Sequence, residues 1–383
     1  MIVTVVSDVL GEENNGTTIA AYNLIRSLRK RGHTVRIVCS DQEHKGEPDY
    51  YVVPKLNLGR IINAAVARNN VSLSKPDVNI INEAITGADV VHVMFPFPLG
   101  IKAAKLAHQR NIPLTAGFHM QAENLTAHLA LMDFGLANLL VYRAAWRLMY
   151  RHCCCIHYPT EFIRKTFEKA THKKTPAYVI SNGVNQQFHR KHVDRPDRYD
   201  GKFLIQSTGR LSKEKTQHVL IDAIDLSRHR DEIQLVIAGK GPLYDKLVQR
   251  GEKLPNKPEF VFLSREDLVN QLNMSDLYVH PAEIEIEAIS CLEAIACGLV
   301  PVIANSRRSA TKFFALDERN LFRNKSAKDL ARRIDYWIEH PKEREIMRRV
   351  YSGFSDQHEF EHCMDNMEKM MKEAIEKHHE KES

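Results

Sequence analysis

The chain has 383 residues, of which 43% are hydrophobic and 27% are charged. This composition is typical of a globular protein and excludes a disordered one, and the length suits two domains of ordinary size. The first residues form an apolar run without a basic segment or cleavage site, so we expect no export signal. The apolar stretch 125–150 is interrupted by Asp133, Arg143 and Arg147, which makes it a poor membrane span.

The cysteines suggest no disulfide framework. There are seven of them, an odd number, and none forms a Cys-x2-Cys pair. Cys153, Cys154 and Cys155 follow one another in an expected buried strand, where cysteine behaves as a small hydrophobic residue. We therefore expect no zinc site and a reducing compartment, which indicates a cytoplasmic location.

The net charge of +6 is unevenly distributed. Residues 135–175 contain eight basic side chains but only Glu161 and Glu168 as acids, an excess equal to that of the whole chain. A basic patch of this kind indicates an anionic surface or substrate. Nucleic acid is not the expected partner, because no recognition motif with interleaved aromatic residues accompanies the patch.

Short apolar runs alternate with helical patterns along the whole chain. Runs rich in Val and Ile that are separated by helical stretches are typical of βαβ units and parallel sheets. In the first half the expected strands are residues 2–7, 35–39, 90–93, 114–118, 154–158 and 178–180. In the second half they are residues 203–207, 234–238, 260–262, 277–280 and 300–304.

A polar segment separates these two series of strands. Residues 189–201 contain Pro196 and end at Gly201, a composition typical of a linker. Two parallel-sheet domains joined there would face each other across a cleft, with ligands at the carboxyl ends of the strands. The predicted division is an N-terminal domain 1–188, the linker 189–201, a C-terminal domain 202–350 and a tail 351–383.

The end of the tail is predicted to be helical. Five apolar side chains recur there at spacings of three or four, namely Phe360, Met364, Met367, Met371 and Ile375. We expect this methionine-rich stripe to pack against a domain rather than to bind a separate partner.

The strongest chemical signal follows the strand that is expected to end at His280. A helix is expected to begin just after Glu285 and to end at Gly298, a typical C-terminal cap. The free N–H groups at the start of such a helix can bind an anion such as a phosphate. The N–H groups expected at this helix start are those of Ala288, Ile289 and Ser290.

Two carboxylates of this segment are candidate site residues. Glu285 would lie at the mouth of the cleft and Glu293 two turns further along the same helix face, so that one reaches a sugar and the other a ribose. The alternative is that Glu283, Glu285, Glu287 and Glu293 form a solvated helix start. We favour the functional interpretation because Glu293 stands in an apolar run, where an unpaired carboxylate is costly.

With these residues the chain resembles glycosyltransferase family four. The family hallmark, Glu-x7-Glu followed by Ala-x-Ala-x-Gly-x-Pro-Val, is matched from Glu285 to Ala304 with one extra residue between the glycine and the proline. Further family segments, in the same order and spread over nearly the whole chain, are residues 32–35, 180–185, 208–215, 238–242 and 275–280.

The resemblance implies an α/β protein with the GT-B fold. In this fold two Rossmann-like parallel-sheet domains face each other across a cleft, and the C-terminal helix returns to the N-terminal domain. The implied reaction transfers a hexose, with glucose or galactose favoured, from a UDP-sugar with retained configuration. Because the first domain marks no carboxylate as a covalent nucleophile, the acceptor would attack the face from which the diphosphate leaves. The leaving phosphate would take the acceptor proton.

The resemblance also implies roles for individual residues. Arg210 and Lys215 would hold the donor diphosphate and stabilise it as it leaves, and we therefore expect no metal and no cofactor. Glu293 would bind the ribose, and Glu285 would lie near the transferred sugar. His119, at the end of a first-domain strand, matches the histidine that contacts the sugar.

Three further positions concern the donor. Gly16, which follows Asn15 where relatives have a glycine pair, would let the backbone approach the phosphates. Ser264 and Arg265 follow the strand 260–262, where relatives bind the nucleobase. Relatives commonly have Glu-Gly-Phe-Gly where this chain has Glu-Ile-Glu-Ala from residue 285, a departure that concerns the donor and not the reaction class.

The acceptor is suggested by residues 139–151, which predict a basic amphipathic helix. Three arginines share one face and three large apolar side chains another. In chain order these are Tyr142, Arg143, Trp146, Arg147, Met149 and Arg151. Such a helix suits an anionic membrane surface, and the alternative is a helix that covers the sheet with its arginines in water.

The chain is also similar to bacterial diacylglycerol glucosyltransferases. This similarity implies a membrane lipid acceptor such as diacylglycerol and a peripheral position on the inner face of the cell membrane. A soluble acceptor, such as a polysaccharide precursor or a small molecule, and a nucleotide-sugar epimerase on the same fold remain open. A nicotinamide oxidoreductase is not expected, because no Gly-x-Gly-x-x-Gly follows the first strand.

Overall fold

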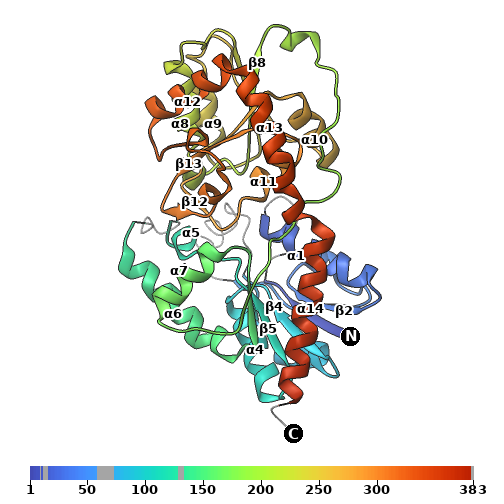
Figure 1. Cartoon of the computed structure of the whole chain (residues 1–383). Helices are drawn as coiled ribbons and strands as arrows, with labels where there is room; N and C mark the ends of the chain where they lie inside the picture. Colours follow the sequence, from blue (N-terminus) through green and yellow to red (C-terminus); the bar gives the residue numbers. More distant parts are fainter. Residues whose placement is uncertain (9, 12–15, 58–72, 128–132, 381–383) are drawn as a thin grey trace. The chain divides into compact units, whose positions relative to one another are not determined.

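The computed structural model describes the chain except for residues 9, 12–15, 58–72, 128–132 and 381–383. It divides into two units (Figure 1). The first unit consists of Met1–Ser181 and Cys363–Ser383, and the second of Asn182–His362. The second unit thus begins ahead of the predicted boundary, the segment 189–201 belongs to it, and the predicted tail is shared between the two units.

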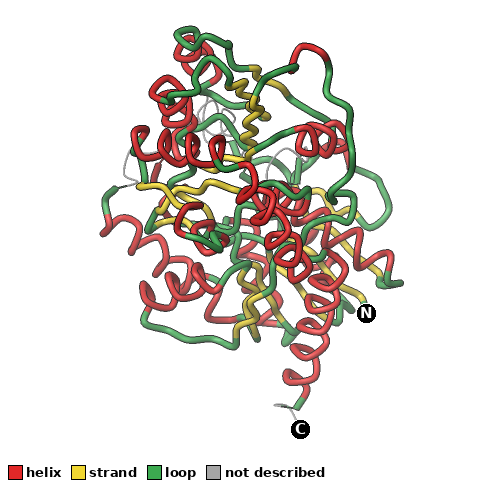
Figure 2. Tube along the Cα trace, turned by 45° about the horizontal axis from the view of Figure 1, so that its top comes forward, coloured by secondary structure: helices red, strands yellow, loops and turns green. Residues whose placement is uncertain are grey.

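The first unit contains one parallel sheet, whose strand order among the described residues is β3-β2-β1-β4-β5-β6-β7. Its strands are β1 (Ile2–Val6), β2 (Thr34–Cys39), β3 (Tyr50–Val52), β4 (Val90–Val93), β5 (Leu114–Gly117), β6 (Cys155–Tyr158) and β7 (Ala177–Val179). Its helices are α1 (Gly16–Lys30), α3 (Val78–Ile85), α4 (Pro98–Gln109), α5 (Ala122–Ala127), α6 (Gly135–Leu148), α7 (Glu161–Thr171) and α14 (Phe360–His379). Figure 2 shows these strands flanked by helices.

The second unit contains a second parallel sheet, of order β10-β9-β8-β11-β13-β15. Its strands are β8 (Phe203–Thr208), β9 (Ile233–Ala238), β10 (Glu259–Val261), β11 (Leu277–His280), β13 (Pro301–Asn305) and β15 (Leu321–Arg323), and a separate parallel pair is formed by β12 (Ile284–Glu285) and β14 (Arg308–Ser309). Its helices are α8 (Gln217–Leu226), α9 (Tyr244–Gly251), α10 (Arg265–Met274), α11 (Ile289–Ala296), α12 (Ala327–Glu339) and α13 (Pro341–Ser355).

Every strand that was predicted from the sequence is present. The central strands are buried on both faces, as the apolar runs indicated. The edge strands β3 and β15 and the pair β12–β14 were not predicted. They are two or three residues long, too short for a periodicity of their own. The strands β3 and β15 each pair with a longer strand, whereas β12 and β14 pair with each other.

The strand order places one candidate site in each unit. In the second unit the chain runs from β8 to β9 and β10 on one side of the sheet and then to β11, β13 and β15 on the other. Ligands of parallel sheets bind at the carboxyl ends of the strands where this direction reverses, which here is between β8 and β11. The corresponding place in the first unit lies between β1 and β4.

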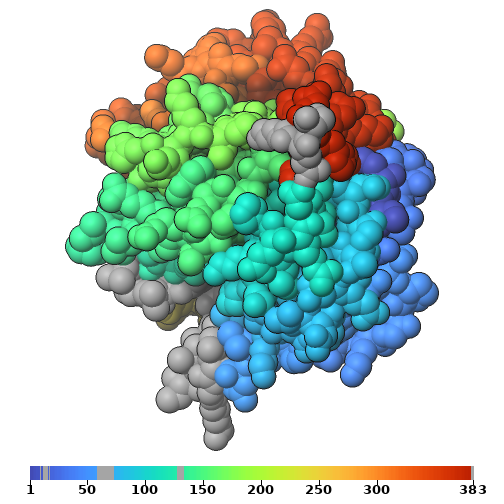
Figure 3. Space-filling view, turned by 90° about the horizontal axis from the view of Figure 1, so that it is seen from below, coloured from blue at the N-terminus to red at the C-terminus, as the bar shows by residue number. Residues whose placement is uncertain are grey.

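The C-terminal helix α14 packs on the first unit, as the resemblance implied. One face is buried and carries Met364, Met367, Met370 and Met371. Two ion pairs flank this face, Arg31 with Asp365 at 2.7 Å and His33 with Glu368 at 3.0 Å. Figure 3 shows the end of α14, in red, against the blue and cyan surface of the first unit. The methionine stripe is therefore a packing face.

We predict that Met371→Ala destabilises the first unit selectively. Met371 is fully buried, and truncation of a buried methionine costs about 2–5 kcal/mol of unfolding free energy. Hydrogen–deuterium exchange should accelerate in β1 and β4 but not in β8 and β11. Lys369→Ala, on the exposed side of the same helix, is the control. Equal acceleration in both sheets would contradict the assignment of α14 to the first unit.

Candidate functional site

The loops after β8 and β9 meet backbone to backbone. A side chain on Gly239 would collide with the carbonyl group of Gly209, so glycine is required where the two loops approach each other. This close approach explains the Gly-rich segment 238–242. It also fixes the loop that carries Arg210 directly after β8.

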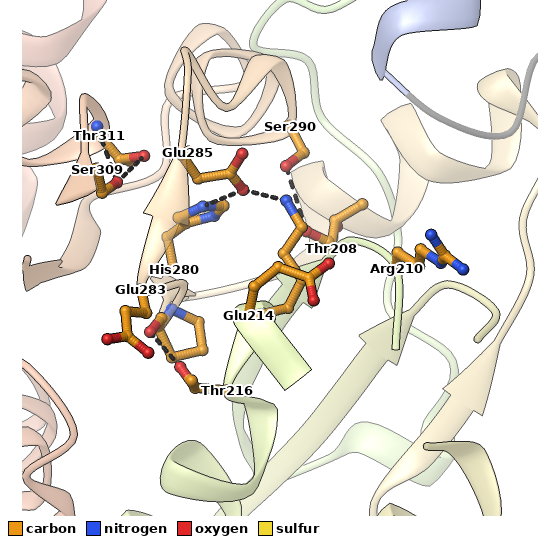
Figure 4. Close-up of polar contacts among 12 residues, drawn as sticks. Thr208, Arg210, Glu214, Thr216, His280, Glu283, Glu285, Ser290, Ser309 and Thr311 are labelled. Carbon is orange, nitrogen blue, oxygen red and sulfur yellow. Dashed lines mark hydrogen bonds and ion pairs between the residues drawn. The ribbon is translucent and has the colours of Figure 1, made fainter. Parts of the chain in front are cut away.

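Three side chains from three different elements meet at the end of β11 (Figure 4). Lys215 forms an ion pair with Oε1 of Glu285, and Nε2 of His280 lies 3.1 Å from the same oxygen. Lys215 ends a 3-10 turn (Lys213–Lys215), His280 ends β11, and Glu285 ends β12. We call these three residues the Glu285 cluster. It stands where the strand order of the second sheet reverses.

The Glu285 cluster keeps its carboxylate ionised. Burial by itself would raise the pKa of Glu285, but the charge of Lys215 and the hydrogen bond with His280 outweigh burial and lower the pKa to about 2. At neutral pH Glu285 therefore carries a full negative charge in a largely buried position, with the ammonium group of Lys215 directly beside it.

Hydrogen bonds extend the cluster to the start of α11. The hydroxyl of Tyr278 lies 3.4 Å from Nδ1 of His280 and 3.3 Å from the hydroxyl of Ser290. Ser290 in turn donates to the carbonyl oxygen of Thr208 at 3.2 Å. His280 was expected at a strand end, but neither it nor Tyr278 was predicted to be a site residue. A polar residue at the carboxyl end of a buried strand was the available signal.

The prediction that Glu285 and Glu293 share one helix face is wrong. Glu285 lies in the short strand β12, and α11 begins only at Ile289. Ala288 adopts a left-handed conformation with φ 64° and ψ 67° just before the first residue of α11, so the helix cannot extend back towards Glu285. Glu287 just before it is buried and accepts hydrogen bonds from the backbone and side-chain amides of Asn182.

The glutamates of this segment do not form a solvated helix start. Glu283, Glu287 and Glu293 are all buried. Each has its own partner within the second unit: Glu283 pairs with Lys325 at 2.8 Å, Glu287 accepts from Asn182, and Glu293 pairs with Arg265 at 2.9 Å. The expectation that an apolar context makes Glu293 more than a surface charge is confirmed.

Glu293 and Arg265, which were assigned separate donor contacts, bind each other here. The Arg265 guanidinium also lies over the ring of Phe188, 4.8 Å from its centre. Burial raises the pKa of Glu293 to about 7 although Arg265 opposes the shift. Neighbouring Ser264 caps α10, since its hydroxyl accepts from the amide of Asp267 at 3.1 Å.

The remaining predicted donor contacts are Arg210, Gly16 and the first residues of α11. Figure 4 shows the guanidinium of Arg210 directed away from Glu285. Gly16 is the first residue of α1, and Asn15 lies outside the described residues. The first turn of α11 carries the amides of Ile289 and Ser290, and the first N–H groups of a helix have no partner within it.

His119 belongs to a group of three histidines in the first unit. His92 lies on β4, His157 on β6, and the rings of His119 and His157 are 5.4 Å apart. Burial lowers the pKa of His92 to about 3 and of His157 to about 4, and it lowers the pKa of His119 as well. Gly117 lies directly against the imidazole of His119, which would have to shift if position 117 carried a side chain. All three histidines are neutral at pH 7.

The predicted basic helix differs from the observed one. α6 ends at Leu148, so Arg151 lies in the following 3-10 turn, and Tyr142 and Met149 are buried. Trp146 is half-buried, with its ring 6.4 Å from that of Phe167 on α7. α6 packs against α7 (Figure 1), and its aromatic side chains lie at this contact. They therefore do not form an exposed face that could enter a membrane surface.

Another face of α6 is exposed and apolar. Leu136, Leu140 and Leu148 recur at multiples of four residues and are 56%, 59% and 42% exposed. Arg143 and Arg147 are exposed on the same side of the helix. We call these five residues the α6 surface. It combines basic and apolar side chains, which suits the boundary between water and an anionic lipid layer.

The described residues contain neither a membrane-spanning helix nor a group of side chains suited to a metal ion. In that part of the chain no helix is both long and apolar enough to cross a bilayer. No cluster of three or more His, Cys, Asp or Glu side chains suited to a metal ion occurs there either. All seven cysteines lie among the described residues and are free thiols.

We predict that Glu293 makes stability fall as the pH rises. Its pKa is about 7 in the folded protein against an ordinary value of 4.5, so the folded state binds this proton more tightly than the unfolded state. The stabilisation is complete below pH 4.5 and is lost as the pH approaches 7, by about 3 kcal/mol at most.

The test is the melting temperature between pH 5 and 8. Glu293→Gln should remove the decline that Glu293 causes, whereas Glu266→Gln, an exposed change on α10, should not. Parallel pH profiles for the native protein and Glu293→Gln would show that the carboxyl group is not perturbed.

Two protein families match this chain, one in each half. The model described as Glycosyltransferase Family 4 matches residues 14–188, and the model described as Glycosyl transferases group 1 matches residues 188–350. Together they cover residues 14–350, which include every strand of the two large sheets except β1.

Curated relatives are distant. An alpha-monoglucosyldiacylglycerol synthase from Streptococcus pneumoniae is 23% identical over 231 residues, which is 57% of this chain and about half (52%) of that enzyme's length. A GDP-mannose-dependent alpha-mannosyltransferase from Mycolicibacterium smegmatis is 26% identical over 321 residues, 79% of each chain.

A solved structure supports the same architecture. The Anabaena protein HepE, determined with UDP and glucose, has a TM-score of 0.75 at 15% identity and covers 97% of this chain and 100% of its own. This likeness concerns the fold. With both family models matched in order across two Rossmann-like parallel-sheet units, the chain belongs to glycosyltransferase family four and has the GT-B fold.

Proposed function

We propose that this protein is a retaining hexosyltransferase that moves glucose or galactose from a UDP-sugar to a membrane lipid such as diacylglycerol. The observation that carries the proposal is the Glu285 cluster. It places a buried carboxylate and an ammonium group beside the start of α11, at the reversal of strand order where parallel sheets bind ligands.

The donor diphosphate would be held by cations and backbone amides. Arg210 and Lys215 supply positive charge, and Ile289 and Ser290 supply N–H groups at the positive end of the α11 dipole. The diphosphate gains charge as it leaves, so these groups stabilise the transition state more than the bound donor. Two cations at this place would serve in place of a metal ion.

Glu285 has a role in the same step. The transferred sugar becomes positively charged as its bond to the diphosphate breaks. An ionised, buried carboxylate next to it stabilises that charge, and the low pKa of Glu285 keeps it ionised at neutral pH. Lys215, which pairs with Glu285 in the structure, would turn to the diphosphate when the donor binds.

No protein base is assigned to the acceptor proton. His119 is neutral at pH 7, which suits a hydrogen bond with a sugar hydroxyl. We propose that the departing phosphate oxygen takes the acceptor proton on the face that it leaves. The acceptor then attacks from the same face, and configuration is retained.

The lipid acceptor is supported by the α6 surface and by a relative. Its leucines would enter the lipid layer, while Arg143 and Arg147 contact anionic headgroups. The streptococcal relative is named for a glucosylated diacylglycerol. The enzyme would then be peripheral on the inner face of the cell membrane.

GDP-mannose is the second candidate donor. It is favoured by the relatives named as GDP-mannose-dependent mannosyltransferases. The Ile-Glu-Ala sequence after Glu285, in place of the usual Gly-Phe-Gly, lies where the donor sugar would sit and does not distinguish the two donors.

We predict that Lys215→Met lowers kcat by about 100- to 1000-fold, because it removes a cation that acts on the leaving diphosphate. The matched control is Lys213→Met, an exposed lysine in the same 3-10 turn. Nucleotide release under saturating donor is the measurement. Equal activity of the two variants would remove Lys215 from the site.

We also predict that nucleotide release requires a membrane. A panel of UDP- and GDP-sugars, with and without anionic liposomes that contain diacylglycerol, should identify one donor whose turnover rises sharply with liposomes. Leu140→Asn should weaken this response about tenfold, since it removes apolar surface that enters the lipid. The control is Leu226→Asn, because Leu226 is 58% exposed against 59% for Leu140 but lies in the second unit.

The outcomes separate the candidates. Release that is unaffected by liposomes would overturn the lipid acceptor and favour a soluble one. Conversion of a nucleotide sugar without release of the nucleotide would indicate an epimerase. No reaction with any donor would overturn glycosyl transfer itself.

A further inference from the structure

The second unit contains a cavity of about 360 Å³ that the proposed reaction does not use. It lies between the segment 190–193, the ends of α10 and α11, and α13. Its lining residues include Arg190, Lys191, Ser275, Cys297 and Arg348. Ser275 precedes β11 and His280 ends it, so the cavity is at the opposite edge of the sheet from the Glu285 cluster.

Positive charge dominates this cavity. Arg190, Lys191 and Arg348 line it. Two further arginines, Arg195 and Arg344, lie nearby: in addition to burial, Arg195 lowers the pKa of Arg348, and Arg348 and Arg195 lower that of Arg344. Two acidic side chains lie among these five cations. Asp276 pairs with Arg195 at 2.8 Å, and Glu345 pairs with Arg190 at 3.5 Å. Five cations against two acids leave an excess of positive charge.

Arg348 is the most constrained of these cations. Its side chain is 20% exposed, and one terminal nitrogen donates to the carbonyl oxygens of Ser275 and Asp276 at 3.3 and 3.1 Å. Its Nε–H is buried and has no hydrogen-bond partner among the residues that the structure describes. Burial and the neighbouring arginines lower the pKa of Arg348.

We propose that this cavity binds a small anion that carries a phosphate or diphosphate group. Arginine presents its N–H groups in a planar fork that matches phosphate oxygens, and Arg348 and Arg190 approach the cavity from α13 and from the linker segment. Lys191 adds a third cation. An anion there would offset the mutual repulsion of the arginines.

The competing explanation is purely structural. The Arg190 stem packs against Gly298 at the end of α11, where a side chain would lie 3.0 Å from Cδ of Arg190. Cations near the carboxyl end of a helix are stabilising in themselves. If that were their whole function, removing Lys191 would change no ligand affinity.

The experiment is calorimetric titration of inorganic diphosphate into the full chain. The Arg210→Ala/Lys215→Ala background is used, so that the proposed donor site does not contribute. We expect one diphosphate per chain. Lys191→Gln and Arg190→Gln in this background should each weaken binding at least about tenfold, the effect of one charge-assisted hydrogen bond. Both side chains are exposed, so folding should be unaffected. Arg349→Gln is the control, since it removes an equal charge from α13, next to Arg348 but outside the residues that line the cavity.

The results decide between the explanations. Loss of all diphosphate binding in the Arg210→Ala/Lys215→Ala background, or equal affinity in the Lys191→Gln, Arg190→Gln and Arg349→Gln proteins, would overturn the proposal. Competition by glycerol 3-phosphate would identify a free phosphate compound as the ligand type. Competition only by dihexanoyl phosphatidic acid would identify a lipid headgroup. This outcome is independent of activity, so it stands or falls separately from the proposed glycosyl transfer.

Discussion

The second unit depends on one buried charge, the carboxylate of Glu285. A carboxylate taken out of water must be compensated, and Lys215 and His280 do so from two other elements. Removing either partner would leave a buried charge unpaired, so the 3-10 turn after β8, the end of β11 and strand β12 are held in one arrangement. The same arrangement places a negative and a positive charge where the strand order reverses.

The backbone near Glu285 is shaped by the same requirement. Ala288 occupies a left-handed conformation that glycine adopts more easily, at a cost of about 1 kcal/mol or more. The buried hydrogen bonds between Glu287 and Asn182 hold the chain just before this turn. A buried carboxylate and an amide therefore help to fix the start of α11.

Basic residues serve different purposes in the two units. On α6 they lie among exposed leucines, a combination that suits an extended anionic surface. In the second unit Arg190 and Arg348 line a small, partly open cavity, a combination that suits a small anion. Arg164, counted in the basic segment, is instead paired with Glu161 and Glu168 on α7. Net charge along the sequence therefore did not reveal which cations act together.

The sequence by itself determined the class of fold, the long strands, the methionine-rich packing face of α14 and the family. These features depend on local periodicity and on spacing within one segment, which neighbouring residues set. Only the tertiary structure decided the partners of charged groups: that Glu293 binds Arg265, that Glu285 lies on a strand, and that Trp146 faces inward. Such pairings join residues far apart in the chain, and their energy depends on burial, which the order of residues does not specify.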